Sequence, residues 1–187
     1  MGHLTPALHY AIRPITLVDE PFLWEMVYQA IYVPPGVTPP PRDILDHAEL
    51  RRYVQGWGRP SDLGVLAVDR ETSQPIGAAW LRLLTGDNKG YGYVDETTPE
   101  LTIAVLPAYR GKGLGTALLS HLLTMAQGSY PAVSLSVSPA NPALRLYQRL
   151  GFAVVGACGT SLTLRSTLQP SLSPLSNWTM IPSGSDT

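Results

Sequence analysis

The feature that most restricts the fold is a glycine-rich turn, Arg-Gly-Lys-Gly-Leu-Gly at residues 110–115, placed directly between a strand pattern and a helix pattern. Apolar and polar residues alternate over 100–105, and leucines recur on one face from 114 to about 127. A helix that begins at such a turn leaves backbone N–H groups free at its positive end, and glycines let an anion approach them closely. The turn therefore predicts a pyrophosphate site, to which its two basic side chains add charge.

Two better-known glycine motifs do not fit this turn. A Walker loop needs Ser or Thr after its lysine, but Lys112 is followed by Gly113. A dinucleotide-binding fingerprint counted from Gly111 needs Gly or Ala at position 116, which is Thr116. What remains is the pattern Arg-x-x-Gly-x-Gly.

The rest of the chain reads as a proline-bearing edge strand, two helices that precede the main sheet, and further strands and helices. A helix capped by Asp19 is expected to end before the Pro-Pro-Gly at 34–36, and another to start at Asn141-Pro142 and stop at Gly151. The expected strands are 9–16, 63–68, 75–84, 100–105, 132–137, 152–156 and 160–165, and the other helices are 43–54 and 114–127.

Length and composition favour one domain, which we place at residues 1–165, followed by a Ser/Pro/Thr-rich tail at 166–187 that we expect to be flexible. A net charge of -1 argues against nucleic acid as a partner. The lone Cys158 excludes an intrachain disulfide, and no Cys/His spacing suggests a metal site. We expect a cytoplasmic protein without signal peptide or membrane span. Because only 14% of the residues are charged, a homodimer interface is one expected use of the surface.

The glycine pattern and its neighbours resemble the GNAT superfamily of N-acetyltransferases. The resemblance runs in order through Ala104-Val105, the turn, the strand at 132–137, the segment Asn-Pro-Ala-Leu-Arg-Leu-Tyr at 141–147 and the closing Leu-Gly-Phe at 150–152. It covers roughly residues 12–164. It implies an α/β (α+β) fold with a mixed, mostly antiparallel sheet of about seven strands and about four helices, splayed between the strands at 100–105 and 132–137.

The resemblance also implies acetyl-CoA as the cofactor, with its pantetheine arm in the splay. The backbones of Ile103 and Val105 would then bind the arm, and the Val105 N–H would stabilise an oxyanion. Asn141 resembles the family asparagine that contacts the arm, although helix capping alone would explain it. The implied cofactor-binding residues are Ile103, Ala104, Val105, Arg110, Gly111, Lys112, Gly113, Leu114, Gly115, Thr116 and Asn141.

Acetyl transfer to an amine needs a base for the amine and an acid for the leaving thiolate. By resemblance Tyr147 is the acid; the alternative is a core aromatic among neighbouring leucines. Glu100, at the start of its strand, is the candidate base; the alternatives are a solvated strand-end carboxylate, or Asp95 or Glu96 as the base. Cys158 has no nearby basic partner, so we expect direct attack in a ternary complex without an acyl-cysteine.

The acceptor is predicted to be a primary amine of a small molecule. Trp24, Tyr28 and Tyr32 form an aromatic stripe along the first helix. Trp24 and Tyr28, with Asp95 and Glu96, are the candidate substrate residues for a cationic amine. Ordinary packing is the alternative for the stripe. Two other functions stay open: acetylation of proteins or peptides, and a non-catalytic CoA-binding or sensing domain.

Overall fold

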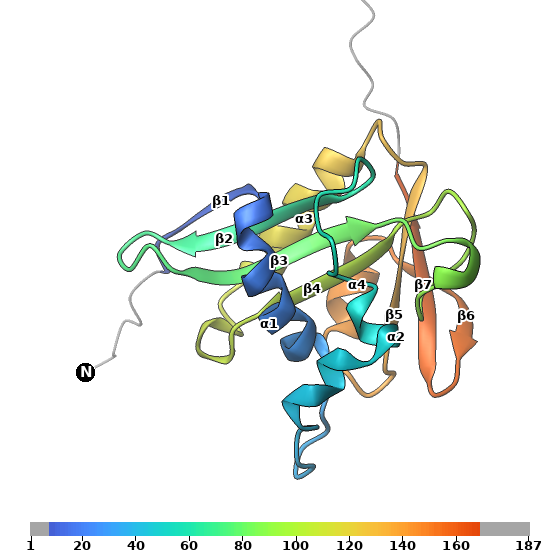
Figure 1. The fold of residues 1–187 in the computed structure, drawn as a ribbon, viewed down its shortest axis with the longest axis horizontal. Coiled ribbons are helices and arrows are strands. Elements are labelled where there is room, and N and C mark those ends of the chain that lie inside the picture. Colours follow the sequence, from blue (N-terminus) through green and yellow to red (C-terminus); the bar gives the residue numbers. More distant parts are fainter. Residues whose placement is uncertain (1–7, 169–187) are drawn as a thin grey trace, which may run out of the picture.

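The computed structural model describes residues 8–168, which form one seven-stranded sheet in the order β1-β2-β3-β4-β5-β7-β6 (Figure 1). Every neighbouring pair is antiparallel except β4 and β5, which are parallel. The strands are β1 Tyr10–Pro14, β2 Leu63–Asp69, β3 Pro75–Arg82, β4 Glu100–Val105, β5 Ala132–Val137, β6 Ala153–Cys158 and β7 Ser161–Thr167. The α-helices are α1 Glu20–Ala30, α2 Ala48–Arg51, α3 Leu114–Ala126 and α4 Leu144–Arg149.

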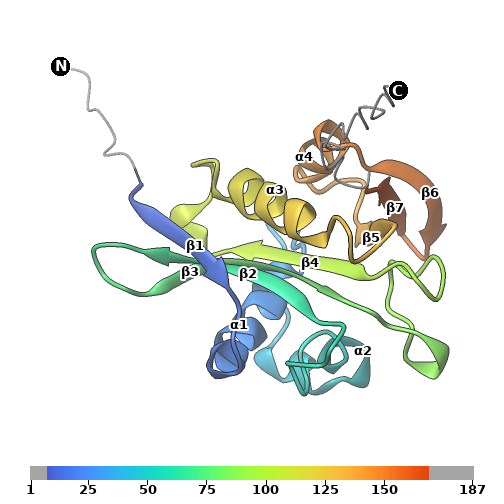
Figure 2. The ribbon, with the colours of Figure 1, turned by 90° about the horizontal axis from the view of Figure 1, so that it is seen from above.

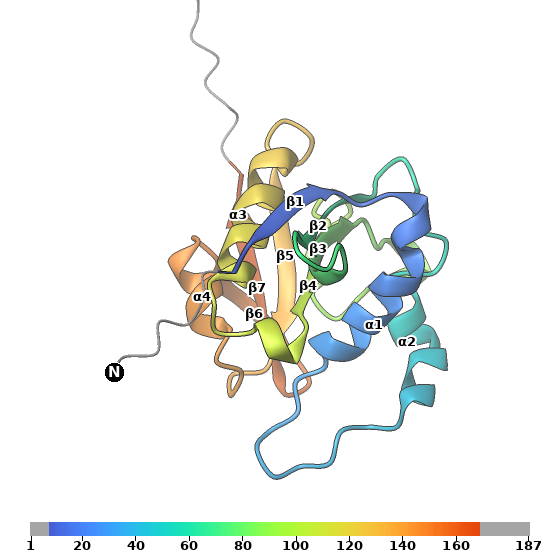
Figure 3. The ribbon, with the colours of Figure 1, turned by 90° about the vertical axis from the view of Figure 1, so that its left-hand side faces the viewer.

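The helices cover both faces of the sheet, so the molecule has three layers. Figures 2 and 3 show α3 and α4 on one face and α1 and α2 on the other. The alternation of side chains along β3 serves both layers, because Ala79 and Leu81 pack in the α3 core while Ala78 and Trp80 pack in the α1 core. None of the helices in residues 8–168 combines the length and apolar character needed to span a bilayer.

The predicted mixed sheet is confirmed, and β4 and β5 have the predicted bounds. The predicted edge strand is also confirmed, since β1 pairs with β2 alone. β7 continues through Thr167, two residues past the predicted domain end at 165, and residues 169–187 of the predicted tail lie outside the described part of the chain.

The prediction of one helix over residues 43–54 was wrong. The segment forms a short 3-10 helix, η2 (Arg42–Asp46), and then α2, with His47 between them in an extended conformation at φ -69° and ψ 133°. The extended residue ends the first element and redirects the chain, after which Tyr53 and Val54 are buried in the α1 core. Tertiary packing thus overrides local helix propensity here.

Candidate active site

The candidate site lies where the parallel strands β4 and β5 separate. They share one register pair, Glu100 with Ser134, and the Ser134 N–H donates to the Pro99 carbonyl at 3.0 Å. Beyond this pair a cavity of about 660 Å³ is lined by residues of both strands, among them Ile103 and Val137. The end of α1 and the segment from η2 to Tyr53 complete the walls.

The glycine turn that follows β4 presents free backbone donors. Gly111 and Gly113 have φ values of +72° and +80°, in the left-handed region that favours glycine. No backbone N–H from Gly111 to Thr116 has an acceptor within residues 8–168, because the first intrahelical bond of α3 is donated by Ala117 to the Gly113 carbonyl. A Cβ at either left-handed glycine would meet nothing within 4 Å. The turn is therefore an open cup of donors that fits a phosphate group.

The two basic residues of the turn have different surroundings. The Arg110 guanidinium donates to the Val105 carbonyl at 2.9 Å and to the side chain of Gln29 at 2.9 Å, so it ties the turn to β4 and α1. The exposed Lys112 ammonium lies 5.6 Å from the ring centre of Tyr109. Lys112 is thus the turn residue whose charge is available to an anion.

Glu100 is buried at the head of β4, with 4% of its surface exposed. Its Oε1 accepts hydrogen bonds from the Tyr53 hydroxyl at 2.7 Å and from the Gly92 N–H at 2.8 Å, whereas Oε2 has no partner within the described residues. Burial raises the pKa of the carboxyl above its ordinary value, and the two hydrogen bonds oppose this shift only in part. The side chain lines the cavity, so the geometry favours a proton acceptor over the solvated strand-end alternative.

The loop that covers Glu100 needs glycine at two positions. A Cβ at Gly90 would lie 2.1 Å from Glu100 Oε2, and one at Gly92 would lie 2.6 Å from the Leu135 backbone. Between them, the Tyr91 N–H donates to the Tyr53 hydroxyl at 2.9 Å. These contacts hold the loop against the carboxylate.

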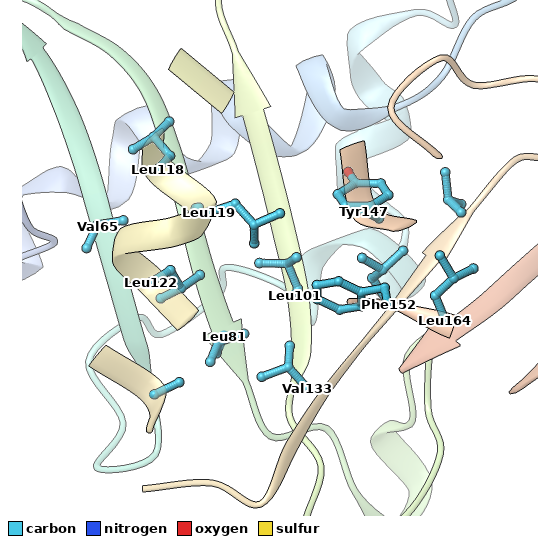
Figure 4. Close-up of a cluster of buried hydrophobic side chains, with 14 of the residues drawn as sticks. Val65, Leu81, Leu101, Leu118, Leu119, Leu122, Val133, Tyr147, Phe152 and Leu164 are labelled. Atoms are coloured by element: carbon cyan, nitrogen blue, oxygen red, sulfur yellow. The ribbon is translucent and has the colours of Figure 1, made fainter. Parts of the chain in front are cut away.

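Tyr147, on α4, is buried beside the point where β4 and β5 diverge (Figure 4). Its ring packs edge-on against Phe152 with centroids 6.0 Å apart, and the side chain also lines the cavity. Burial raises the pKa of the Tyr147 phenol to about 12, so the hydroxyl stays protonated at neutral pH. The residue therefore has both features that the sequence left as alternatives: it is a core aromatic, and it faces the cavity.

Asn141 lines the cavity near Tyr147. Its Oδ1 accepts a hydrogen bond from the Ala143 N–H at 2.9 Å, which caps the turn that leads into α4. The helix begins at Leu144, two residues after Pro142, where the Asn-Pro pair predicts its start. The N-cap position of α4 is Ala143, so the prediction that Asn141 caps the helix was wrong, and its side chain stabilises the preceding turn instead. The side-chain nitrogen of Asn141 has no hydrogen-bond partner within residues 8–168.

The model of the acetyltransferase (GNAT) family matches residues 24–152, which include the glycine turn, both splayed strands and α4. The chain belongs to this family. Its GNAT fold is shared with the ribosomal-protein-S18-alanine N-acetyltransferase of Escherichia coli, which is 18% identical with a TM-score of 0.58 over 89% of this chain and 99% of that one. It is also shared with the spermidine/spermine N-acetyltransferase of Vibrio cholerae, at 19% identity and a TM-score of 0.54 over 85% and 94% of the two chains.

A curated relative is the peptidyl-lysine N-acetyltransferase YjaB of Salmonella typhimurium, 30% identical over 110 residues. The match covers 58% of this chain and spans 62% of the length of that relative. The names of these GNAT proteins thus include a peptidyl lysine, a protein alanine and a polyamine as acceptors.

The structure does not bring the four predicted substrate residues to the GNAT cavity. Trp24 packs in the α1 core, and the Tyr28 hydroxyl donates to the Pro40 carbonyl at 2.8 Å. Asp95 accepts hydrogen bonds from Thr97 and Thr98, its own loop neighbours, and Glu96 accepts one from Tyr93. None of these four lines the cavity, so neither Asp95 nor Glu96 is placed to replace Glu100 as base.

The polar residues of the cavity wall that the sequence did not reveal include Tyr53, Glu49 and Tyr91. Tyr53 is buried, and its backbone carbonyl accepts a hydrogen bond from the Trp80 indole at 2.9 Å. Burial, and then the charge of Glu100, raise the pKa of Tyr53 above its ordinary value, which keeps the hydroxyl a donor to that carboxylate. No motif reveals these residues, because the path of η2 and α2 brings Glu49 and Tyr53 to the site and the loop before β4 brings Tyr91.

Proposed function

We propose that this GNAT protein transfers an acetyl group from acetyl-CoA to a primary amine of a small molecule. The observation that carries the proposal is the cup of unpaired N–H groups at the start of α3, one short loop beyond the strand whose separation from β5 creates the cavity. The cup fits the diphosphate of CoA, and the gap between the strands fits its extended arm.

The residues proposed to hold the cofactor follow this layout. Backbone N–H groups of the turn, from Gly111 to Thr116, would bind the diphosphate; Lys112 would add charge, and Leu114 and Gly115 would contribute through their backbones alone. The backbones of Ile103, Ala104 and Val105 would bind the arm in the gap, and Asn141 would meet it from α4. When bound, acetyl-CoA supplies the activated acetyl thioester.

Two side chains of the cavity wall have complementary proton chemistry. We assign Glu100 the role of accepting the proton that the attacking amine loses, directly or through water, because its raised pKa brings it closer to neutrality. We assign Tyr147 the role of giving its hydroxyl proton to the departing thiolate. The amine nitrogen gains the acetyl carbon, the carbon–sulfur bond breaks, and no acyl-protein intermediate is required.

An assay of thiol release tests the proposed function. Purified protein is incubated with acetyl-CoA and one of three classes of acceptor: small primary amines, lysine-containing peptides, or peptides with a free N-terminal alanine. Release of free thiol with small amines alone is the expected result. Turnover of peptides alone would mean that the acceptor is a protein or peptide and not a small molecule. Binding of acetyl-CoA without turnover of any acceptor would support the non-catalytic alternative.

We also propose a cytoplasmic homodimer. All six residues of β6 are exposed at the edge of the sheet, and the strand carries no charged side chain that would oppose pairing with a second copy. The exposed thiol of Cys158 on the same strand suits a reducing compartment. Sedimentation velocity at micromolar concentration tests the dimer, and a monomer at all concentrations would refute it.

A further inference from the structure

The outer part of the cavity has its own polar pair, Glu49 and Tyr91. Glu49 lies in the first turn of α2, and its Oε2 accepts a hydrogen bond from the Tyr91 hydroxyl at 2.7 Å. Both side chains line the cavity and both are exposed to solvent. The pair therefore lies at the mouth, where an acceptor would enter.

The cavity wall carries two carboxylates. They belong to Glu49 and Glu100; His47 also lines the cavity, and no lysine or arginine among the described residues does. Arg52 does not line the cavity, and its guanidinium donates to the carbonyls of Ala48 and Lys89. Burial raises the pKa values of Glu100 and Tyr91, and the positive charge of Arg52 lowers them without cancelling this rise. At the inner end, Glu100 lines the cavity, and its buried Oε2 lacks a hydrogen-bond partner within residues 8–168.

Tyr91 connects the two carboxylates. Its backbone N–H bonds the Tyr53 hydroxyl, which in turn bonds Glu100, while its own hydroxyl bonds Glu49. The Tyr91 residue, the Tyr53 hydroxyl and these hydrogen bonds therefore span the distance between the two carboxylates. Apolar side chains, including Ile31, Ile44 and Leu50, also line the cavity and suit an aliphatic chain.

From this arrangement we infer that Glu49 and Tyr91 form a subsite for a second positive charge, so that the acceptor is a small aliphatic diamine. One amine would meet Glu100 and be acetylated, and the other would remain an ammonium at Glu49, beside the ring of Tyr91. This inference rests on the proposed acetyl transfer and adds to it a substrate class and the residues that select it.

The loop that carries Tyr91 provides a matched control. Glu96 also accepts a hydrogen bond from a tyrosine hydroxyl, that of Tyr93, at the same 2.7 Å, but neither residue lines the cavity. Glu96→Gln therefore removes the same charge from the same part of the surface without touching the subsite. Any effect of general surface charge would appear in both variants.

The test compares kcat/KM for 1,4-diaminobutane and for pentylamine, which has a similar length and one amine. We expect the wild type to prefer the diamine by about fivefold, the upper end for a solvent-exposed charge pair. In Glu49→Gln this ratio should fall toward one, mainly through KM, whereas Glu96→Gln should keep it. Equal turnover of both amines by the wild type, an equal loss in both variants, or turnover of peptides alone would overturn the inference.

Failure of the inference and failure of the proposed function give different results. Turnover of pentylamine by the wild type shows acetyl transfer whether or not the subsite exists. Calorimetric titration of 1,4-diaminobutane into wild type and Glu49→Gln reports on the subsite without turnover. Weaker binding in the variant is expected; equal binding, or none to the wild type, would overturn the subsite.

Discussion

Among the substitutions of acidic residues proposed here, Asp62→Ala should lower the free energy of unfolding the most. Asp62 accepts two hydrogen bonds from the Arg82 guanidinium, at 2.9 and 2.7 Å, and one each from the N–H groups of Gly58 and Arg59, both at 3.0 Å. The two charged side chains are 1% and 0% exposed. The substitution would leave the Arg82 charge buried without its counter-ion.

The size of this loss of stability depends on the hydrogen bonds that Arg82 retains in the variant. Removing one partner of a buried ion pair typically costs about 3–5 kcal/mol. Arg82 also donates to the carbonyls of Arg52, Gln55 and Gly56, and these bonds survive the substitution. We therefore expect the lower end, about 3 kcal/mol, which corresponds to a fall in Tm of about 6–12 °C for a chain of this length.

Urea unfolding followed by circular dichroism measures this change, with Asp43→Ala as the control. Asp43 is an exposed aspartate in η2, so its loss should change the free energy of unfolding by less than about 0.5 kcal/mol. A loss below about 1 kcal/mol for Asp62→Ala would refute the reasoning, because it would mean that Arg82 does not need its counter-ion.

Three further predictions concern single side chains. Tyr53→Phe removes a hydrogen bond that lowers the pKa of Glu100, so the pKa of Glu100 should rise. The acid limb of the pH profile of kcat/KM should therefore move to higher pH, and an unchanged acid limb would exclude Tyr53 as a positioning residue. Tyr147→Phe should keep the Tm within a few degrees but lower kcat by about 10²-fold or more, and an unchanged kcat would leave Tyr147 a core aromatic alone. The hydrogen bond from Arg13 lowers the pKa of Asp19 from 3.8 to about 2, so the stability that the ionised carboxylate confers is present above pH 4 and lost as pH falls toward 2. The free energies of unfolding of wild type and Asp19→Asn should therefore differ at neutral pH and converge near pH 2. A difference that stays constant with pH would contradict this.

The sheet and the glycine turn were predictable because each depends on local sequence. Alternation fixes the faces of β4 and β5, and the positive φ values of Gly111 and Gly113 need no distant partner. Glu100 and Tyr147 could be predicted as candidates from their positions on these elements, and both side chains line the cavity.

The acceptor side of the cavity was not predictable because distant contacts build it. Buried side chains of β3 fix the chain at Tyr53: the Trp80 indole binds the Tyr53 carbonyl, 27 residues away, and Arg82 binds the carbonyl of Arg52. No sequence period reports such bonds. Conversely, Asp95 looked functional in the sequence, but hydrogen bonds to its own loop account for its side chain.

We assign the turn before α3 as the site that binds the diphosphate of acetyl-CoA. The two glycines that flank α3 allow a matched test of this assignment. Gly113 precedes the helix and Gly128 follows it; both have left-handed φ values, +80° and +92°, and open space where a Cβ would be. Glutamate at either position therefore carries a similar backbone strain, but only at 113 does its charge lie in the proposed anion site.

Isothermal titration of acetyl-CoA into wild type, Gly113→Glu and Gly128→Glu, with the Tm of each measured alongside, tests the claim most directly. We predict binding to the wild type and to Gly128→Glu, and none to Gly113→Glu although both variants remain folded. Undiminished binding to folded Gly113→Glu, or no binding to the wild type, would contradict the assignment of the cofactor site.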